Sequence, residues 1–156
     1  MNRALFTGAG IAGVVLVGAT FWPRQDGTTD LPDAETLALG AALYAETCAS
    51  CHGTELEGQP NWRQPGPDGI LSAPPHDATG HTWHHGDDLL FAYTKYGGAE
   101  TLAARGVNGF ASGIPGFGDQ LTDGQISAVL SFIKSTWPED IRSQQAERTR
   151  MERAGS

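Results

Sequence analysis

The sequence predicts an all-α fold with long loops, and three observations support that prediction. The chain has 156 residues, a length that fits one domain with short appendages. Apolar residues recur at helical spacing in three segments, whereas no segment alternates as a β-strand does and no internal repeat stands out. The 21 glycines and 9 prolines gather mainly between those segments, as long loops require.

The first segment predicts a membrane signal. Residues 4–22 form a run of 19 residues without a charge; as a helix it spans roughly 28 Å, close to the hydrocarbon thickness of about 30 Å. Residues 1–23 are therefore predicted to be a signal or anchor helix, with Trp22 at the far interface. The alternative is a cleaved signal peptide with small residues at 17–19. Either way we expect the remainder at the periplasmic side of a bacterial-type inner membrane, tethered to it or soluble after cleavage.

Two helices are predicted early in the exported part. Residues 24–32 are polar and turn-rich and are predicted to be a tether. The domain proper, residues 33–137, opens with a helix that Asp33 caps and that runs to Cys48. A second helix is predicted over residues 87–96, and the glycine-rich stretches before and after it are predicted to be loops, residues 53–80 and 97–121.

The third helix has the clearest signal. Thr122 and Gln125 match a capping box, and an apolar stripe follows, made of Ile126, Val129, Leu130 and Ile133. The helix is predicted to end near Trp137. Residues 138–156 form a polar C-terminal tail with four acidic and four basic residues, which either continues as a helix or frays.

One motif predicts a cofactor. Cys48 and Cys51 are the only cysteines, and His52 follows them directly, which gives C-x-x-C-H, the attachment signature of c-type haem. On a helical turn, positions i, i+3 and i+4 share one face, so both thiols and the imidazole point at the same group. The thiols can add to the haem vinyl groups while His52 binds the iron. One covalent haem c would also complete a core for which few periodic apolar segments are left.

Two other interpretations of the cysteines stay open. A zinc site would join both thiols to two histidines, although 29 residues separate Cys51 from His81, more than in compact zinc fingers. A redox disulfide would need a strand and helix alternation that the chain lacks. The histidines available to a zinc site are His76, His81, His84 and His85.

With this motif, residues 33–137 resemble the class I mono-haem cytochromes c. Gly40 and Tyr44 fall where the first helix of that family crosses the last, and residues 114–121 resemble the loop that delivers the sixth iron ligand. The resemblance implies an all-α, cytochrome c-like fold of helices and long loops wrapped around one haem. It also implies that the carbonyl of Pro74 (or Pro75) accepts the N–H of the proximal imidazole and orients it.

The chain departs from this family at the sixth ligand. Ile114, which has no donor atom, stands where the family carries methionine, and the only methionines are Met1 and Met151. The sixth site is therefore predicted to be vacant or labile. The alternatives are Lys95, a return of Met151 from the tail, or a histidine of the His-rich loop, that is His81, His84 or His85.

Three further residues are predicted to lie near the edge of the haem. Trp62, Arg63 and Trp83 are predicted to hydrogen-bond the haem propionates. A copper or zinc site at His81 and His85, which are i and i+4 if that segment is helical, is a second hypothesis for the His-rich loop.

Charge and cofactor together predict the function. The net charge of −8 excludes a nucleic-acid binder and lies within residues 33–137, which hold 12 acidic and 4 basic residues. We expect a membrane-tethered, non-enzymatic carrier of single electrons between redox proteins, docking on basic surfaces. The alternative is a binder or sensor of carbon monoxide or nitric oxide that uses a vacant sixth site; weak peroxidase activity is the least favoured, because no distal acid–base pair is identifiable.

Overall fold

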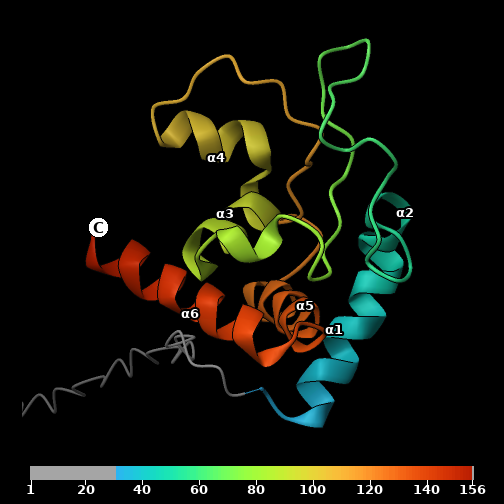
Figure 1. Cartoon of the computed structure of the whole chain (residues 1–156), viewed down its shortest axis with the longest axis vertical. Helices are drawn as coiled ribbons and strands as arrows, with labels where there is room; N and C mark the ends of the chain where they lie inside the picture. The colour runs from blue at the N-terminus through green and yellow to red at the C-terminus, as the bar shows by residue number, and fades with distance from the viewer. Residues whose placement is uncertain (1–30, 156) are drawn as a thin grey trace, which may run out of the picture.

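The computed structural model describes residues 31–155, and within them every regular element is a helix (Figure 1). The helices are α1 (Ala34–Thr47), α2 (Ala49–His52), the 3₁₀ turn η1 (Thr82–His84), α3 (Asp87–Tyr96), α4 (Gly98–Ala104), α5 (Asp123–Ser135) and α6 (Glu139–Ala154). The predicted anchor, residues 1–23, lies outside the described residues. Among the residues that are described, no helix has the length and apolar character of a membrane span.

Helix α1 begins and ends as its sequence predicts. Asp33 accepts a hydrogen bond from the backbone N–H of Thr36 at 2.9 Å, which satisfies one of the free donors at the helix start. The helix ends at Cys48, whose N–H donates to the carbonyl of Tyr44. The first cysteine of the motif therefore sits at the junction between α1 and α2.

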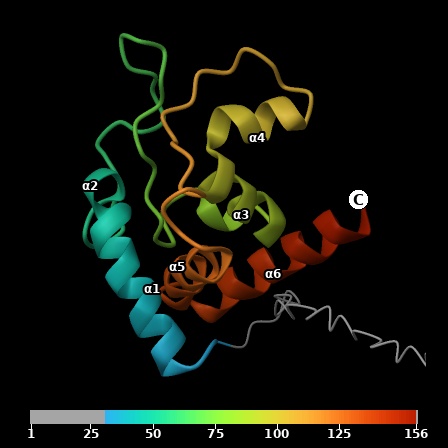
Figure 2. The same cartoon turned by 180° about the vertical axis from the view of Figure 1, so that it is seen from behind.

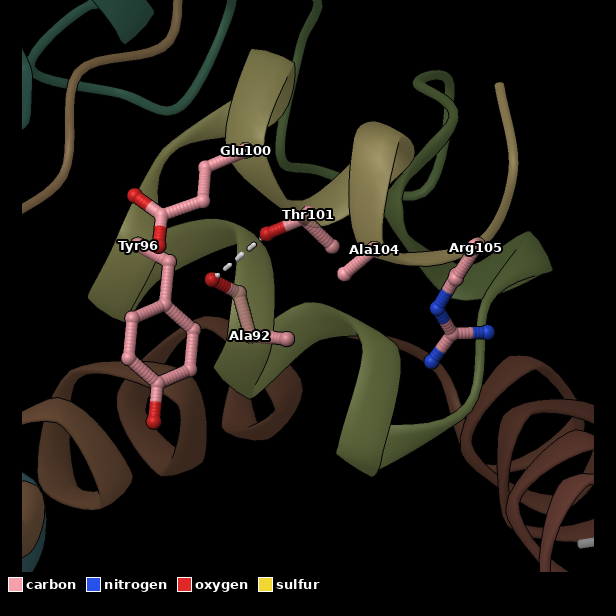
Figure 3. A pocket seen from close by; sticks show the side chains of 6 residues that line it. All are labelled: Ala92, Tyr96, Glu100, Thr101, Ala104 and Arg105. Atoms are coloured by element: carbon pink, nitrogen blue, oxygen red, sulfur yellow. Dashed lines mark hydrogen bonds between the residues drawn. The ribbon is translucent and has the colours of Figure 1, made fainter. Parts of the chain in front are cut away.

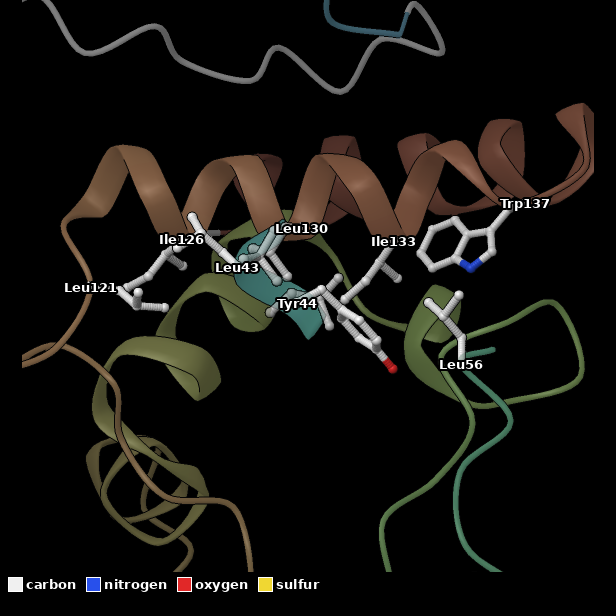
Figure 4. Packing of buried hydrophobic residues seen from close by; sticks show 10 residues of the cluster. Leu43, Tyr44, Leu56, Leu121, Ile126, Leu130, Ile133 and Trp137 are labelled. Carbon is white, nitrogen blue, oxygen red and sulfur yellow. The ribbon is translucent and has the colours of Figure 1, made fainter. Parts of the chain in front are cut away.

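The crossing of α1 and α5 is the main packing contact of the domain (Figures 1 and 4). A Cβ atom on Gly40 would lie 2.1 Å from the backbone oxygen of Ala128, so the two backbones approach as closely as only glycine allows. Tyr44 lies one turn further along α1, with its ring 5.5 Å from that of Phe132. The sequence-based placement of Gly40 and Tyr44 at this crossing is confirmed.

Helix α5 carries the core. Both halves of the capping box are present at its start: Thr122 accepts from the N–H of Gln125, and the Gln125 side chain accepts from the N–H of Thr122. Ile126 is 0 % exposed and Trp137, just beyond the helix, is 1 % exposed. Figure 4 shows the side chains of this stripe directed towards Leu43 and Tyr44 of α1.

Helix α4 corrects the prediction that residues 97–121 are loop throughout. It opens on two glycines and has no side-chain cap, so the sequence carries no start signal for it. Tertiary contacts compensate, because the N–H of Gly98 donates to the carbonyl of Ile114 and Thr101 Oγ1 donates to the carbonyl of Ala92. In both views α3 lies between α4 on one side and α5 and α6 on the other (Figure 2).

The polar tail forms helix α6, which packs on the start of α3 through polar side chains. Gln145 is fully buried and its Nε2 donates to Asp87 Oδ1 at 2.7 Å and to the carbonyl of His85 at 3.1 Å. Thr149 Oγ1 accepts from the N–H of Asp87, and Lys134 of α5 pairs with the Asp87 carboxylate at 2.9 Å. A buried hydrogen-bond network, in place of an apolar stripe, therefore attaches α6.

Candidate haem site

The three residues of the C-x-x-C-H motif lie on one helical turn. The N–H of His52 donates to the carbonyl of Cys48 at 2.9 Å, so both thiols and the imidazole project from the same short helix, as the spacing predicts. Both cysteines are free thiols; Cys51 is exposed, and burial raises the pKa of the half-buried Cys48 thiol. Their arrangement suits an attachment chemistry in which each sulfur bonds to an external group instead of to the other sulfur.

His52 presents one ring nitrogen for ligation. Its Nδ1 lies 2.8 Å from the carbonyl oxygen of Pro74, so Nδ1 carries the proton and Nε2 is the nitrogen with a lone pair. Burial lowers the pKa of His52, which keeps the imidazole neutral, and the bond to Pro74 opposes part of that effect. The carbonyl that the resemblance implies therefore belongs to Pro74, not to Pro75.

The loop after the motif is folded so that Pro74 reaches His52. Gly58 donates its N–H to the carbonyl of His52 and adopts a φ of +68°, which turns the chain back. Gln59 then pairs with Ala73 through two hydrogen bonds, one from its N–H and one to its side-chain oxygen. The residue after Ala73 is Pro74, so these contacts deliver its carbonyl to the imidazole.

A second histidine lies flat against the first. The rings of His76 and His52 are stacked, with centroids 3.8 Å apart and planes 19° apart. Nδ1 of His76 is 2.6 Å from Thr82 Oγ1, and burial lowers the pKa of His76 to about 3, with a smaller electrostatic contribution from the neighbouring His52. The sequence indicates His76 only as a candidate zinc ligand and does not predict its stacking on His52.

The three residues predicted to hydrogen-bond the haem propionates differ in their contacts. Arg63 lies over the ring of Trp62, 4.0 Å from its centroid, and both remain candidates for that role. Trp83 is different, because its Nε1 donates to the carbonyl of Ala78 at 3.2 Å. An indole has a single donor, so the structure does not support Trp83 as a hydrogen-bond donor to a propionate.

The His-rich loop forms a cluster of rings. His81 stacks on His84 with centroids 5.2 Å apart, and His85 meets His81 edge-on at 4.8 Å. The segment between them is the 3₁₀ turn η1, so the helical i, i+4 geometry behind the second-metal hypothesis is absent. In residues 31–155, no three histidine, cysteine or acidic side chains converge as a bare metal ion requires, and the zinc interpretation of the two cysteines therefore gains no support.

Ile114 lies on a loop that joins α4 to α5. Its side chain is 39 % exposed, and its carbonyl accepts the N–H of Gly98 at 3.0 Å. The neighbouring Gly113 approaches Ile70, since a Cβ placed on it would lie 3.0 Å from that side chain. The loop therefore passes the segment that leads to Pro74, and it presents an alkyl group at the position where the resemblance places the sixth ligand.

Two residues predicted as alternative sixth ligands, Lys95 and Met151, lie outside the loop that carries Ile114. Lys95 pairs with Asp123 at 2.7 Å, at the start of α5. Met151 lies in the last turns of α6 with its side chain 52 % exposed, on the helix that packs against the start of α3. In this structure neither residue belongs to the loop that carries Ile114.

A small pocket between α3 and α4 is separate from the motif (Figure 3). Its volume is about 230 Å³, and in Figure 3 the hydrogen bond between Thr101 and Ala92 closes one wall. None of its lining residues belongs to the C-x-x-C-H turn or to the loop after it; they are Ala92, Tyr96, Glu100, Thr101, Ala104 and Arg105.

The donor set fits a covalently attached haem. Two unpaired thiols and one oriented, neutral imidazole share a helical turn, and the backbone carbonyl of Pro74 fixes the tautomer that iron ligation needs. A redox disulfide does not account for the hydrogen bond that orients the His52 imidazole. A zinc site lacks further ligands among the described residues.

Comparison with known proteins agrees with this geometry. The family model described as Cytochrome c matches residues 37–137, about two thirds of the chain. No curated protein and no solved structure matches the chain. The matched region begins within α1 and ends at Trp137, so α6 lies beyond it.

Proposed function

The chain belongs to the cytochrome c family, and from that premise we propose that it is a membrane-tethered carrier of single electrons between redox proteins at the periplasmic face. Haem-based electron transfer is the general function of the family, and haem c is the cofactor of this chain. The observation that carries the proposal is the pairing of His52 Nδ1 with the carbonyl of Pro74, which prepares one fixed iron ligand.

Haem c, when bound, supplies an iron that alternates between the ferric and ferrous states and so holds one electron. The residues of the chain determine how that electron is held. Cys48 and Cys51 attach the group through thioethers, and His52 provides Nε2 as the proximal ligand. Because Pro74 holds the Nδ1 proton, it increases the basicity of Nε2 and favours the ferric state.

Charge supports a protein partner with a basic docking surface. The excess of acidic residues lies in residues 33–137, whereas the tail is balanced. Two residues of the tail form ion pairs with the domain: Arg153 pairs with Asp88, and Glu152 pairs with Arg105. An acidic domain of this kind attracts a basic partner over about a Debye length, roughly 8–10 Å at physiological salt.

The electron-transfer test is kinetic. Full-length reduced holoprotein is mixed with an oxidised basic cytochrome or basic copper protein, and the rate of oxidation is followed at increasing salt. We expect the rate to fall steeply with ionic strength. A neutral chemical oxidant serves as the control and should show a flat dependence. Equal salt profiles for the two oxidants would contradict electrostatic docking.

Membrane attachment rests on the charge-free run at residues 4–22. Expression of the full chain in a bacterium that matures c-type cytochromes, followed by fractionation, tests it. We expect the red pigment in the inner-membrane fraction, facing the periplasm and resistant to extraction by high salt. Pigment that is soluble in the periplasm would indicate that the leader is cleaved, and pigment in the cytoplasm would contradict export.

A second candidate function, binding of small diatomic ligands, is favoured by what the structure shows at two candidate residues for the sixth ligand. Ile114 offers no donor atom, its side chain is 39 % exposed, and Lys95 is paired with Asp123. We infer that the side of the haem opposite His52 is accessible to carbon monoxide or nitric oxide. Addition of carbon monoxide to the reduced holoprotein should shift its Soret band; an unchanged spectrum would show that a protein group occupies the position.

A further inference from the structure

His76 is held in place by its backbone before its side chain is considered. Its N–H donates to the carbonyl of Leu56 at 2.8 Å, and its carbonyl accepts the indole N–H of Trp137 at 2.7 Å. Leu56 and Trp137 are both buried members of the core cluster. The backbone of His76 is therefore held by residues of the core.

The His76 ring itself has a fixed orientation. Its Nδ1 lies 2.6 Å from the hydroxyl of Thr82, a buried residue at the start of η1. The ring of Tyr44 approaches it edge-on, with centroids 6.2 Å apart and planes at 70°. With its two flanks defined by Thr82 and Tyr44, the ring presents one flat face to His52.

The imidazole of His52 needs two constraints to have a defined plane. The torsion that turns a histidine ring about its Cβ–Cγ bond is broad, so packing has to select the angle. The bond to Pro74 restrains the edge of the ring at Nδ1, but a ring can still tilt about the direction of a single hydrogen bond. The face of His76, 3.8 Å away between centroids and 19° from parallel, blocks that tilt.

We propose that His76 is a positioning residue for the haem ligand: anchored by Thr82, its ring sets the plane of the His52 imidazole. The proposal goes beyond the proposed function and rests only on His52 as the proximal ligand, so it does not depend on the carrier role or on the membrane tether. The same chemistry applies whether the protein passes electrons or binds a diatomic ligand.

The test uses the oxidised holoprotein with cyanide bound, and it measures the paramagnetic proton shifts of the four haem methyl groups. Cyanide is axially symmetric, so the spread and order of these shifts report the plane of the histidine alone. We expect His76→Leu to change the order or the spread of the methyl shifts. His76→Phe keeps a flat ring but loses the bond to Thr82, and Thr82→Val keeps the imidazole but frees its Nδ1; both should give smaller changes in the same direction.

The control is Thr136→Val, which is matched to Thr82→Val, because the Thr136 hydroxyl donates to the carbonyl of Ile133 within α5 and not to His76. It should leave the methyl shifts unchanged. Wild-type shifts in His76→Leu would overturn the proposal, and so would changes in Thr136→Val equal to those in Thr82→Val. If His76→Leu fails to mature, Thr82→Val decides: unchanged shifts contradict the anchoring by Thr82. Loss of the carrier function with an intact methyl pattern would refute the proposed function alone.

Discussion

The two sides of the candidate haem site are built differently. On the proximal side, residues 48–82, the ring of His52 is bonded to Pro74 and stacked on His76, which the core holds in place. In the distal loop, residues 105–121, the exposed apolar side chains are those of Val107, Phe110 and Ile114, of which Ile114 is 39 % exposed, whereas Leu121 is buried. Its backbone is fixed mainly near its end, where Phe117 and Gly118 bond to the last turn of α3. One ligand is therefore prepared by the fold, whereas the loop where the resemblance places the sixth ligand offers no donor atom at Ile114.

The largest predicted effect breaks the proximal side. Replacement of both thiols, Cys48→Ser with Cys51→Ser, removes the attachment points but keeps the His52 to Pro74 bond. We expect complete loss of covalent haem, measured by whether pigment stays with the protein after acid and organic extraction. Each single replacement should retain one thioether. Pigment that survives extraction in the double variant would show that the thiols do not attach it.

The second prediction changes only the distal side. Ile114→Met introduces a thioether at the position of the family ligand and should give an iron–sulfur absorption band, a higher reduction potential and carbon monoxide affinity lower by about tenfold or more, ~1.4 kcal/mol. Ile114→Leu is the matched control and should alter none of these. If Ile114→Met keeps the wild-type potential and spectrum, another group already binds the iron or the loop does not reach it.

The third prediction tests the close approach of α1 and α5 at their crossing. Gly40→Ala puts a Cβ 2.1 Å from the backbone of Ala128, so α1 and α5 must separate, at a cost of about 1–3 kcal/mol in unfolding free energy. Gly124, near the start of α5, has no atom within 4 Å of its Cβ position. Gly124→Ala should therefore stabilise by about 0.5–1 kcal/mol through helix propensity. Denaturant titration of both holoproteins measures the difference; equal midpoints would contradict the close approach.

The last predicted effect, no larger than that at Gly40, concerns α6. Gln145→Ala leaves Asp87 with fewer partners and should cost about 1–3 kcal/mol in unfolding free energy. Gln144→Ala, at an exposed neighbour, should stay within about 0.5 kcal/mol. Thermal unfolding compares the two variants. A Gln145→Ala variant as stable as Gln144→Ala would show that α6 is attached by something other than this network.

The same contrast separates what sequence can predict from what it cannot. Local signals located α1 and α5, because Asp33 and the pair Thr122 and Gln125 are caps whose hydrogen bonds close within three residues. The motif at residues 48–52 is local in the same sense, since one helical turn defines its geometry. Predictions therefore succeeded wherever the deciding contact lies within a few residues along the chain.

The missed features depend on contacts between distant residues. Gly98 opens α4 only because the carbonyl of Ile114, sixteen positions further along, accepts its N–H. Gln145 is buried among polar partners, so no apolar stripe marks the inner face of α6. The stacking of His76 on His52 spans the loop of residues 53–80, whose path no periodic pattern encodes. The bond from Trp83 to the carbonyl of Ala78 spans only five residues, but no repeating pattern in this loop predicts it.

The hydrogen bond of the Trp137 indole links the packing of the helices to the environment of the iron ligand. It connects the end of α5 to the backbone of His76, two residues beyond the carbonyl that orients the iron ligand. Because the His76 ring stacks on that of His52, this bond links the end of α5 to the iron ligand, and we expect a change at the Gly40 crossing to reach the imidazole through α5. We therefore expect the visible absorption spectrum of the holoprotein to change when the helix packing is disturbed, before the chain unfolds.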